Sequence, residues 1–181
     1  MFFLINKYTY MKKKTIKITR YVMFLFCFFL SMSIQAKRYP FDMKHQYIIE
    51  TVRVDQQGYK FCKVWGIADT VDAAMNRALQ DAVAACLFSG IPGNENTPSS
   101  PAICGSAEVY EKNKKYFNAF FKSGEFLHYV RNVNSRYPSG ENNVKYKGWR
   151  KVAVYVQISY DELRKKMERD GIIRGLDNYF N

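Results

Sequence analysis

The sequence predicts an α+β fold in two layers, with a mainly antiparallel four-stranded sheet packed on two to three helices in the order ββααββα. Three observations predict it. Two segments rich in β-branched and aromatic residues precede a long alanine-rich segment with helical periodicity. A second pair of strand-like segments follows the predicted helices. Turn-forming residues separate the members of each pair.

Residues 1–36 have the layout of a secretory signal peptide, with basic residues, then the apolar run YVMFLFCFFLSM, then a short stretch that ends at Ala36. We expect cleavage after Ala36 and translation starting at Met1 or Met11. A membrane anchor is the alternative, but the run is shorter than the roughly 20 residues of a spanning helix. A lipid anchor at Cys27 is disfavoured by the bulky Phe26 before it. We therefore expect a periplasmic or envelope location without a membrane span after cleavage.

Residues 37–181 are then expected to form a single α+β envelope domain, because 145 residues suffice for one core. Residues 1–36 hold six Lys or Arg and no acid, which leaves 22 basic and 16 acidic residues and a net charge of +6. Such a charge suits anionic surfaces in general, and export separates the chain from nucleic acid, so no nucleic-acid partner is expected.

The first two strands are predicted over residues 45–54 and 58–68, joined by the turn signal DQQG into a hairpin. A helix follows, capped by Asp69 or Thr70. Alanine occupies six of the fourteen positions from 72 to 85. We expect the small face of this helix to pack on the sheet, with Phe61, Val64, Trp65 and Ile67 filling the remaining space. The polar residues Asp72, Asn76, Gln80 and Asp81 are expected on the opposite side.

Gly90, Pro92 and Gly93 end this helix and begin a polar loop that runs to Gly105. Cys86 and Cys104 flank the loop, and in an oxidising compartment we expect them to form a disulfide. In the chain-entropy model, closing a loop of this length stabilises a fold by about 3 kcal/mol. Cys62 lies in a predicted strand and is expected to be a buried thiol rather than a nucleophile.

A second helix is predicted from about Ser106 to Phe121, and its aromatic residues are expected in the core: Tyr110, Tyr116, Phe117, Phe120 and Phe121. Strands are predicted over residues 125–135 and 144–159, with YPSGENN as the turn between them. In the last strand, Val152, Val154, Val156 and Ile158 share one face, which predicts the core side.

A third helix is expected after Ser159, which with Glu162 has the spacing of a capping box. Leu163 and Met167 form its apolar stripe. Gly171 and Ile172 fit a left-handed C-terminal cap. The residues from 172 to 181 are expected to be a loosely docked tail.

A resemblance rests on three features: the pattern GIADTVDAAMNRALQDAVAAC, the loop and second helix, and the strand KVAVYVQIS continuing into YDELRKKME. Residues 47–168 resemble the small envelope domain in the N-terminal part of flagellar assembly protein T and related surface lipoproteins. The resemblance implies a non-catalytic α+β domain that takes part in envelope assemblies. This chain departs from the family by lacking a usable lipidation cysteine and by inserting the loop of residues 89–105.

Few residues suggest catalysis or cofactor binding. His45 and His128 have no metal-ligand neighbour at short spacing, so no metal site is expected. A Cys–His hydrolase using Cys62 or Cys104 with His128 lacks an orienting third group. The glycines at 90, 93 and 105 lack the strand, phosphate loop and helix that nucleotide binding requires. We expect no catalytic residues and no cofactor.

The candidate binding residues lie on the second face of the sheet. Trp149, Lys151 and Tyr155 share it in the last strand, and Lys63 and Trp65 can extend it from the second strand. Exposed aromatic rings beside cations suit docking to a protein or stacking on sugar rings. The alternative is that the long loop or the C-terminal tail covers this face.

The sequence therefore favours an exported, non-enzymatic protein that acts through protein contacts in a cell-surface or periplasmic assembly. The alternative is a glycan or cell-wall binding module that uses the aromatic face, and a hydrolase is the third hypothesis.

Overall fold

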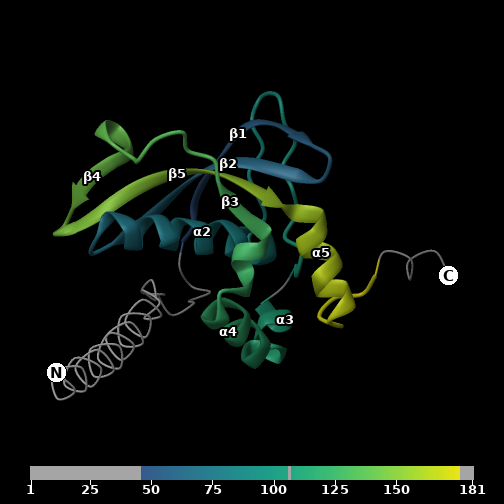
Figure 1. Ribbon diagram of the computed structural model, residues 1–181. Coiled ribbons are helices and arrows are strands. Elements are labelled where there is room, and N and C mark those ends of the chain that lie inside the picture. The colour runs from purple at the N-terminus through teal and green to yellow at the C-terminus, as the bar shows by residue number, and fades with distance from the viewer. Residues whose placement is uncertain (1–45, 106, 176–181) are drawn as a thin grey trace, which may run out of the picture. The chain divides into compact units, whose positions relative to one another are not determined.

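A computed structural model describes residues 46–105 and 107–175. Its strands are β1 (Ile48–Gln56), β2 (Tyr59–Ala68), β3 (Val130–Asn132), β4 (Asn143–Tyr146) and β5 (Trp149–Ser159). They form an antiparallel sheet in the order β1-β2-β5-β3, and β4 also pairs with β5. Figure 1 shows helix α2 (Val71–Phe88) along one face of this sheet. The predicted α+β, two-layer fold is confirmed, with five strands in place of four.

The first hairpin forms as predicted. Strands β1 and β2 pair from Ile48 opposite Trp65 to Gln56 opposite Tyr59. The turn residues Gln57 and Gly58 both have positive φ, at 47° and 79°. This combination belongs to the type I′ turn, whose twist matches that of the two strands.

Helix α2 packs directly on β2 and β5 through its alanines. Thr70 is its N-cap, and the Thr70 hydroxyl accepts a hydrogen bond from Ala73 N at 3.2 Å. Ala74, Ala78 and Ala82 are fully buried. A Cβ added to Gly66 of β2 would lie 2.0 Å from the Ala74 carbonyl oxygen. The small face therefore meets another part of the same chain, as the sequence predicted.

Two expectations about this helix were wrong. Gln80 and Asp81 are 3% and 1% exposed, because α2 is surrounded on more than its sheet side; Asp81 forms an ion pair with Arg77 at 3.0 Å. Of the large residues expected against the alanines, Val64 alone faces the core layer. Phe61, Trp65 and Ile67 alternate with it and point to the other face of the sheet, since successive strand side chains cannot share a face.

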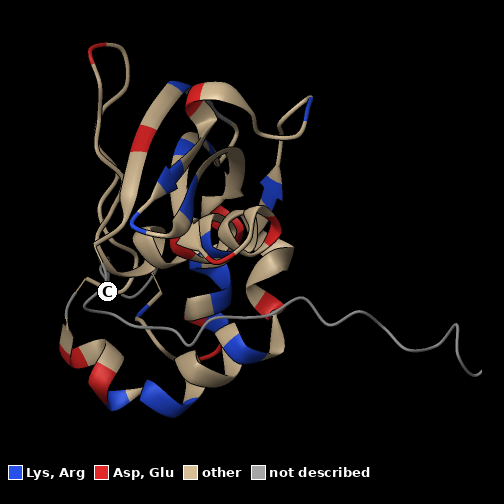
Figure 2. Cartoon of the chain, turned by 90° about the vertical axis from the view of Figure 1, so that its left-hand side faces the viewer, with Lys and Arg blue, Asp and Glu red and all other residues tan. Residues whose placement is uncertain are grey.

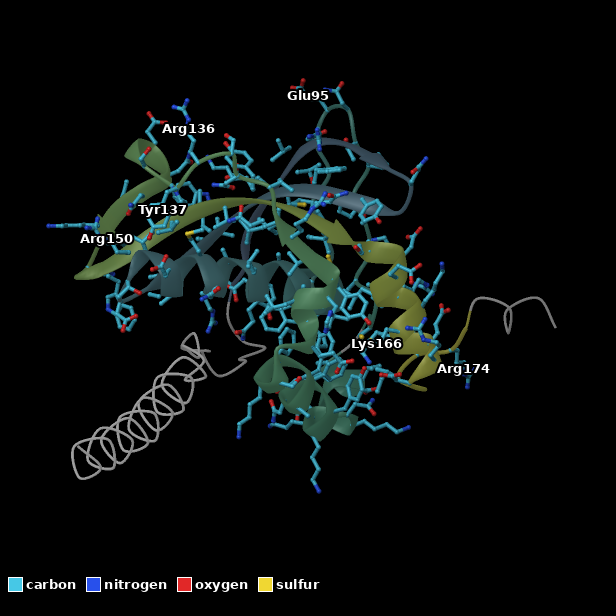
Figure 3. All side chains as sticks on the ribbon, viewed as in Figure 1. Glu95, Arg136, Tyr137, Arg150, Lys166 and Arg174 are labelled. Atoms are coloured by element: carbon cyan, nitrogen blue, oxygen red, sulfur yellow. The ribbon has the colours of Figure 1, made fainter. Side chains whose placement is uncertain are left out.

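The loop of residues 89–105 folds back on itself and lies along the edge of β1. Ile91 pairs with Ser100 and Asn94 with Thr97. Thr51 Oγ1 donates to Pro92 O at 2.5 Å, and Asn94 Nδ2 donates to Thr51 O at 3.1 Å. Figure 3 shows Glu95 at the far end of this loop. The loop thus covers part of a sheet edge, which limits edge-to-edge association.

The second predicted helix is divided at Asn113 into α3 (Ala107–Lys112) and α4 (Lys114–Ser123). The Asn113 side chain donates to Val109 O at 2.9 Å, competing with continued helical geometry. The aromatic core is confirmed for Tyr110, Phe117, Phe120 and Phe121, which are buried, whereas Tyr116 is half-buried and packs against the edge of this core. The Phe88 ring of α2 meets Tyr110 and Phe117 edge-on, at centroid distances of 5.6 and 4.9 Å.

The predicted strand over residues 125–135 is mostly a 3-10 helix, η1 (Glu125–Tyr129), followed by the short β3. The predicted turn YPSGENN contains a second 3-10 helix, η2 (Gly140–Asn142). The predicted strand 144–159 is two strands, because Lys147 and Gly148 take φ of 48° and 83° and turn β4 back onto β5. The core face of β5 is confirmed: Val152, Val154, Val156 and Ile158 are buried.

Helix α5 (Tyr160–Arg169) follows Ser159, but the expected capping box is absent. The Ser159 side chain makes no cap hydrogen bond, and Glu162 instead pairs with Lys165 at 2.8 Å. The C-terminal cap is confirmed, since Gly171 has φ of 70° and Ile172 N donates to Met167 O at 2.9 Å. Leu163 and Met167 are fully buried.

Several expectations lie outside the described residues: the signal peptide, Cys27, His45 and the last residues of the tail. Within residues 46–105 and 107–175, no helix combines the length and apolarity needed to cross a bilayer.

Candidate functional site

The outer face of the sheet is the face opposite α2, and strand register brings three of the four predicted binding residues together there. Lys63 of β2 lies directly opposite Tyr155 of β5. Trp65 lies opposite Ala153, whose methyl group leaves space for the indole. Lys151 lies opposite Ile67, which places it diagonally across from Trp65 on the same face.

The two lysines contact the aromatic rings. Lys63 Nζ lies 5.0 Å from the centroid of Trp65 and 5.7 Å from that of Tyr155. Lys151 Nζ lies 4.8 Å from the Trp65 centroid. Cation–π contacts contribute about 0.5–1 kcal/mol at exposed sites and about 2 kcal/mol when desolvated, and these four side chains are half-buried. Both ammonium groups are therefore held in place beside one indole, and we name Lys63, Trp65, Lys151 and Tyr155 the cation–aromatic cluster.

Trp149, the fourth predicted residue, lies elsewhere on the same face. It is six residues from Tyr155 along β5, a separation of about 20 Å in an extended strand. Its aromatic neighbour is Tyr146, directly opposite in β4. Trp149 and Tyr146 are 48% and 44% exposed, so this pair forms a second aromatic patch at the end of the sheet.

The outer face is predominantly basic. Besides the two lysines it carries Arg53, whose guanidinium carbon lies 3.8 Å from the Phe61 ring centroid, and Arg131 of β3. Among outward-facing strand positions with described side chains, Glu50 is the only acid, opposite Lys63. Figure 2 marks the charged positions along the chain; helix α3 carries both signs, whereas the charged residues of α4 are all lysines. The outer face therefore has a positive potential that favours an anionic ligand.

The expected disulfide is not present. Cys62, Cys86 and Cys104 are each buried as separate thiols. The loop is closed instead by backbone hydrogen bonds, with Ile103 N donating to Cys86 O at 2.9 Å and Cys104 N to Leu87 O at 2.8 Å. These bonds satisfy carbonyls at the end of α2 that otherwise lack intrahelical donors.

The described cysteines are poorly suited to nucleophilic chemistry. Burial raises the pKa of the Cys104 thiol to about 12, although the Arg164 charge opposes this shift. The thiolate is the reactive form, so Cys104 is inert at neutral pH. Cys62 is 1% exposed in the core layer, whereas His128 is exposed in η1.

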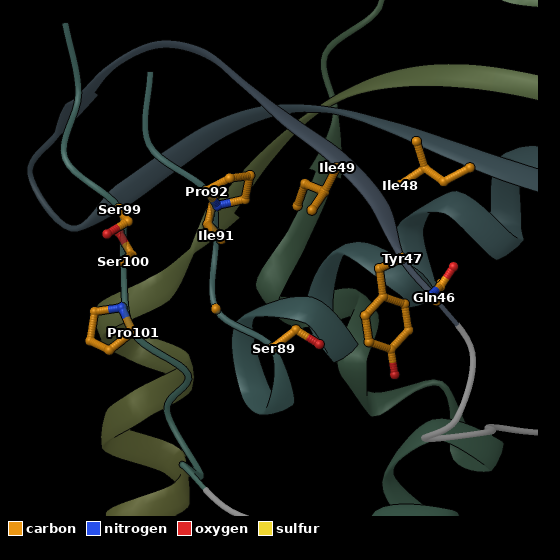
Figure 4. A pocket seen from close by; sticks show the side chains of 11 residues that line it. Gln46, Tyr47, Ile48, Ile49, Ser89, Ile91, Pro92, Ser99, Ser100 and Pro101 are labelled. Carbon is orange, nitrogen blue, oxygen red and sulfur yellow. The ribbon is translucent and has the colours of Figure 1, made fainter. Parts of the chain in front are cut away.

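A groove of about 1010 Å³ lies between the beginning of β1 and the long loop (Figure 4). None of its lining residues carries a charge: Gln46, Tyr47, Ile48, Ile49, Ser89, Gly90, Ile91, Pro92, Ser99, Ser100 and Pro101. It offers hydroxyls, backbone groups and apolar surface but no acid–base pair, so we place the candidate site on the outer face.

Sequence reasoning missed Tyr146 and Glu50. The signal for Tyr146 was the Lys147–Gly148 pair, because a two-residue turn places Tyr146 and Trp149 opposite each other. The position of Glu50 follows from the register of β1 on β2, which the sequence does not specify when a bulge interrupts the pairing.

Comparison of the chain with protein-family models, curated proteins and solved structures finds no match.

Proposed function

We propose that this protein is a non-enzymatic docking module of the cell envelope that binds an acidic surface of a partner protein through the outer face of its sheet. The observation that carries the proposal is the cation–aromatic cluster, in which Lys63 and Lys151 flank Trp65 at 5.0 and 4.8 Å. Aromatic side chains and cations held in fixed positions bind with a small loss of conformational entropy. The layout of the N-terminal 36 residues supports export.

The test compares the full chain with the double variant Lys63→Glu/Lys151→Glu. Partners are captured from envelope extracts with crosslinking, identified and purified, and affinity is measured at two salt concentrations. We expect the variant to lose affinity by about tenfold or more, and wild-type affinity to fall as salt rises. The matched control is Lys112→Glu/Lys115→Glu, the same charge change on exposed residues of α3 and α4. The proposal is contradicted if both double variants lose the same affinity, or if Lys63→Glu/Lys151→Glu loses none.

Glycan binding is the second candidate, favoured by the exposed Tyr146–Trp149 pair. Two neighbouring rings of this kind can stack on sugar rings. The variant Tyr146→Ala/Trp149→Ala distinguishes the candidates: lost cell-wall polysaccharide binding with retained protein partner favours the glycan.

A further inference from the structure

A small pocket lies at the end of the outer face, where β3 joins the sheet. It has a volume of about 380 Å³ and seven lining residues: Tyr59, Leu127, His128, Val130, Arg131, Gln157 and Ser159. Strand register explains the convergence. Tyr59 lies opposite Ser159, and Arg131 lies opposite Gln157 on the same face. Helix η1 adds the wall that contains Leu127 and His128.

Each polar side chain of the pocket has at least one hydrogen-bond donor. Arg131 supplies a permanently charged guanidinium, Tyr59 and Ser159 supply hydroxyls, and His128 supplies an imidazole. No Asp or Glu lines the pocket. Asp161 is an acid beside it, with its side chain over Gly58.

Arg131 is held in position by its neighbour. One terminal nitrogen of the guanidinium donates to Gln157 Oε1 across the strands. A guanidinium has five N–H donors, so one such bond orients the group and leaves others for a ligand. Paired N–H groups of this kind match the two oxygens of a carboxylate.

We propose that this pocket binds a carboxylate of the partner protein, either an acidic side chain or the C-terminal carboxylate. The inference rests on the proposed function, since it names one chemical group that the outer face recognises. A carboxylate fits better than a phosphate, because the single permanent positive charge of the lining balances a monoanion. The hydroxyls of Tyr59 and Ser159, which line the same pocket, can then donate to the carboxylate oxygens.

The experiment titrates the isotopically labelled full chain with short peptides and follows the NMR signals of the Arg131 side chain. One peptide has blocked ends and a central Glu, the second has a C-terminal carboxylate and no acidic side chain, and the third has blocked ends and a central Gln. Inorganic phosphate is the fourth probe. We expect saturable shifts with at least one of the two carboxylate peptides. The peptide that binds more strongly shows whether the pocket prefers an acidic side chain or a C-terminal carboxylate. Binding of the Gln peptide and of phosphate should be weaker by about tenfold or more, or about 1.4 kcal/mol.

Arg131→Gln should weaken carboxylate binding by about tenfold. Arg136→Gln is the matched control, because Arg136 is an exposed arginine outside the pocket. This variant should bind the carboxylate peptide with the affinity of the wild type. No saturable shift with either carboxylate peptide, equal binding of the Gln peptide, or equal binding of phosphate would overturn the inference.

The two proposals fail separately. In one case the carboxylate peptides do not bind, while Lys63→Glu/Lys151→Glu still abolishes partner binding. The proposed carboxylate site is then wrong, and the proposed docking face stands. If a carboxylate peptide binds through Arg131 and the lysine variant keeps its partner, the carboxylate site stands and the role of the cation–aromatic cluster is wrong.

Discussion

Gly66 of β2 and Ala74 of α2 approach so closely that no side chain fits between their backbones. A Cβ built on Gly66 would lie 2.0 Å from Ala74 O and 2.6 Å from Ala78 N. These neighbours are helix backbone atoms, which cannot rotate away as a flexible side chain could. The contact explains why this helix is rich in alanine: small residues allow the helix to lie directly on the sheet.

Gly66→Ala should therefore destabilise the protein by about 1–3 kcal/mol or more, because α2 must move away from β2. Urea denaturation measures this change. Gly175→Ala is the control, since a Cβ there meets no atom within 4 Å. Equal stabilities of the two variants would show that α2 does not pack on β2 at this position.

The contact among Tyr116, Lys166 and Asp170 predicts a pH-dependent stabilisation. Tyr116 Oη donates to Asp170 Oδ2 at 2.5 Å, and Lys166 Nζ lies 2.8 Å from the same oxygen and 2.6 Å from Glu125 Oε1. Figure 3 shows Lys166 on α5. Burial alone would lower the pKa of Lys166, but its hydrogen bonds to Asp170 and Glu125 outweigh burial and raise it. Hydrogen bonds from Lys166 and then Tyr116 lower the pKa of Asp170.

The sign of each shift gives the pH range. The Asp170 contribution is present above the unfolded pKa of about 3.9 and is lost as pH falls through the lower folded value. The Lys166 contribution is present below its unfolded pKa of about 10.4 and is lost as pH rises through the higher folded value. Tyr116→Phe should cost about 1–3 kcal/mol at pH 7 and progressively less as the pH falls through the folded pKa of Asp170. Tyr160→Phe is the control, because the Tyr160 hydroxyl donates to the backbone oxygen of Pro101. An equal pH dependence in both variants would contradict the role of Asp170.

The buried thiols predict slow alkylation. In the folded protein, Cys62, Cys86 and Cys104 should react far more slowly than in denaturant, since all three are buried and the pKa of Cys104 is about 12. Mass spectrometry after iodoacetamide treatment, with and without denaturant, measures this difference. If the intact protein is lighter than the fully reduced chain by the mass of two hydrogens, and a reducing agent removes the difference, the protein contains a disulfide. That result would contradict the separate thiols.

The two helix caps predict unequal effects. Thr70→Ala should cost about 1 kcal/mol, because the Thr70 hydroxyl accepts from Ala73 N. Ser159→Ala should cost less than about 0.5 kcal/mol, since its side chain makes no cap hydrogen bond. Denaturant unfolding of both variants gives the comparison, and a larger loss at Ser159 would support the capping box that the sequence predicted.

The lysines of the cation–aromatic cluster should affect stability little. Lys63→Ala and Lys151→Ala should each cost about 0.5–2 kcal/mol, the range for cation–π contacts between exposed and desolvated sites, because the cluster is half-buried. Thermal unfolding checks this expectation. Losses above about 3 kcal/mol would indicate a structural role and would remove these residues as probes of binding.

Local sequence predicted the first hairpin, α2, the aromatic core of α4 and the buried face of β5, because alternation, helical periodicity and turn residues act over short distances. It failed where two local tendencies compete. Asn113 interrupts a helix, and the Lys147–Gly148 turn divides an apolar stretch into two strands. The capping box failed although both residues were present, because Glu162 pairs with Lys165.

The sequence by itself determined which side chains of β5 share a face and that alanine lines one side of α2, since both follow from the period of a single element. Tertiary structure decided the rest. The register of β2 on β5 placed Trp65 between two lysines, and the length of β5 separated Trp149 from Tyr155. Helix packing buried Gln80 and Asp81, and backbone hydrogen bonds rather than a disulfide closed the long loop. These outcomes depend on pairings between distant segments, which local propensity does not encode.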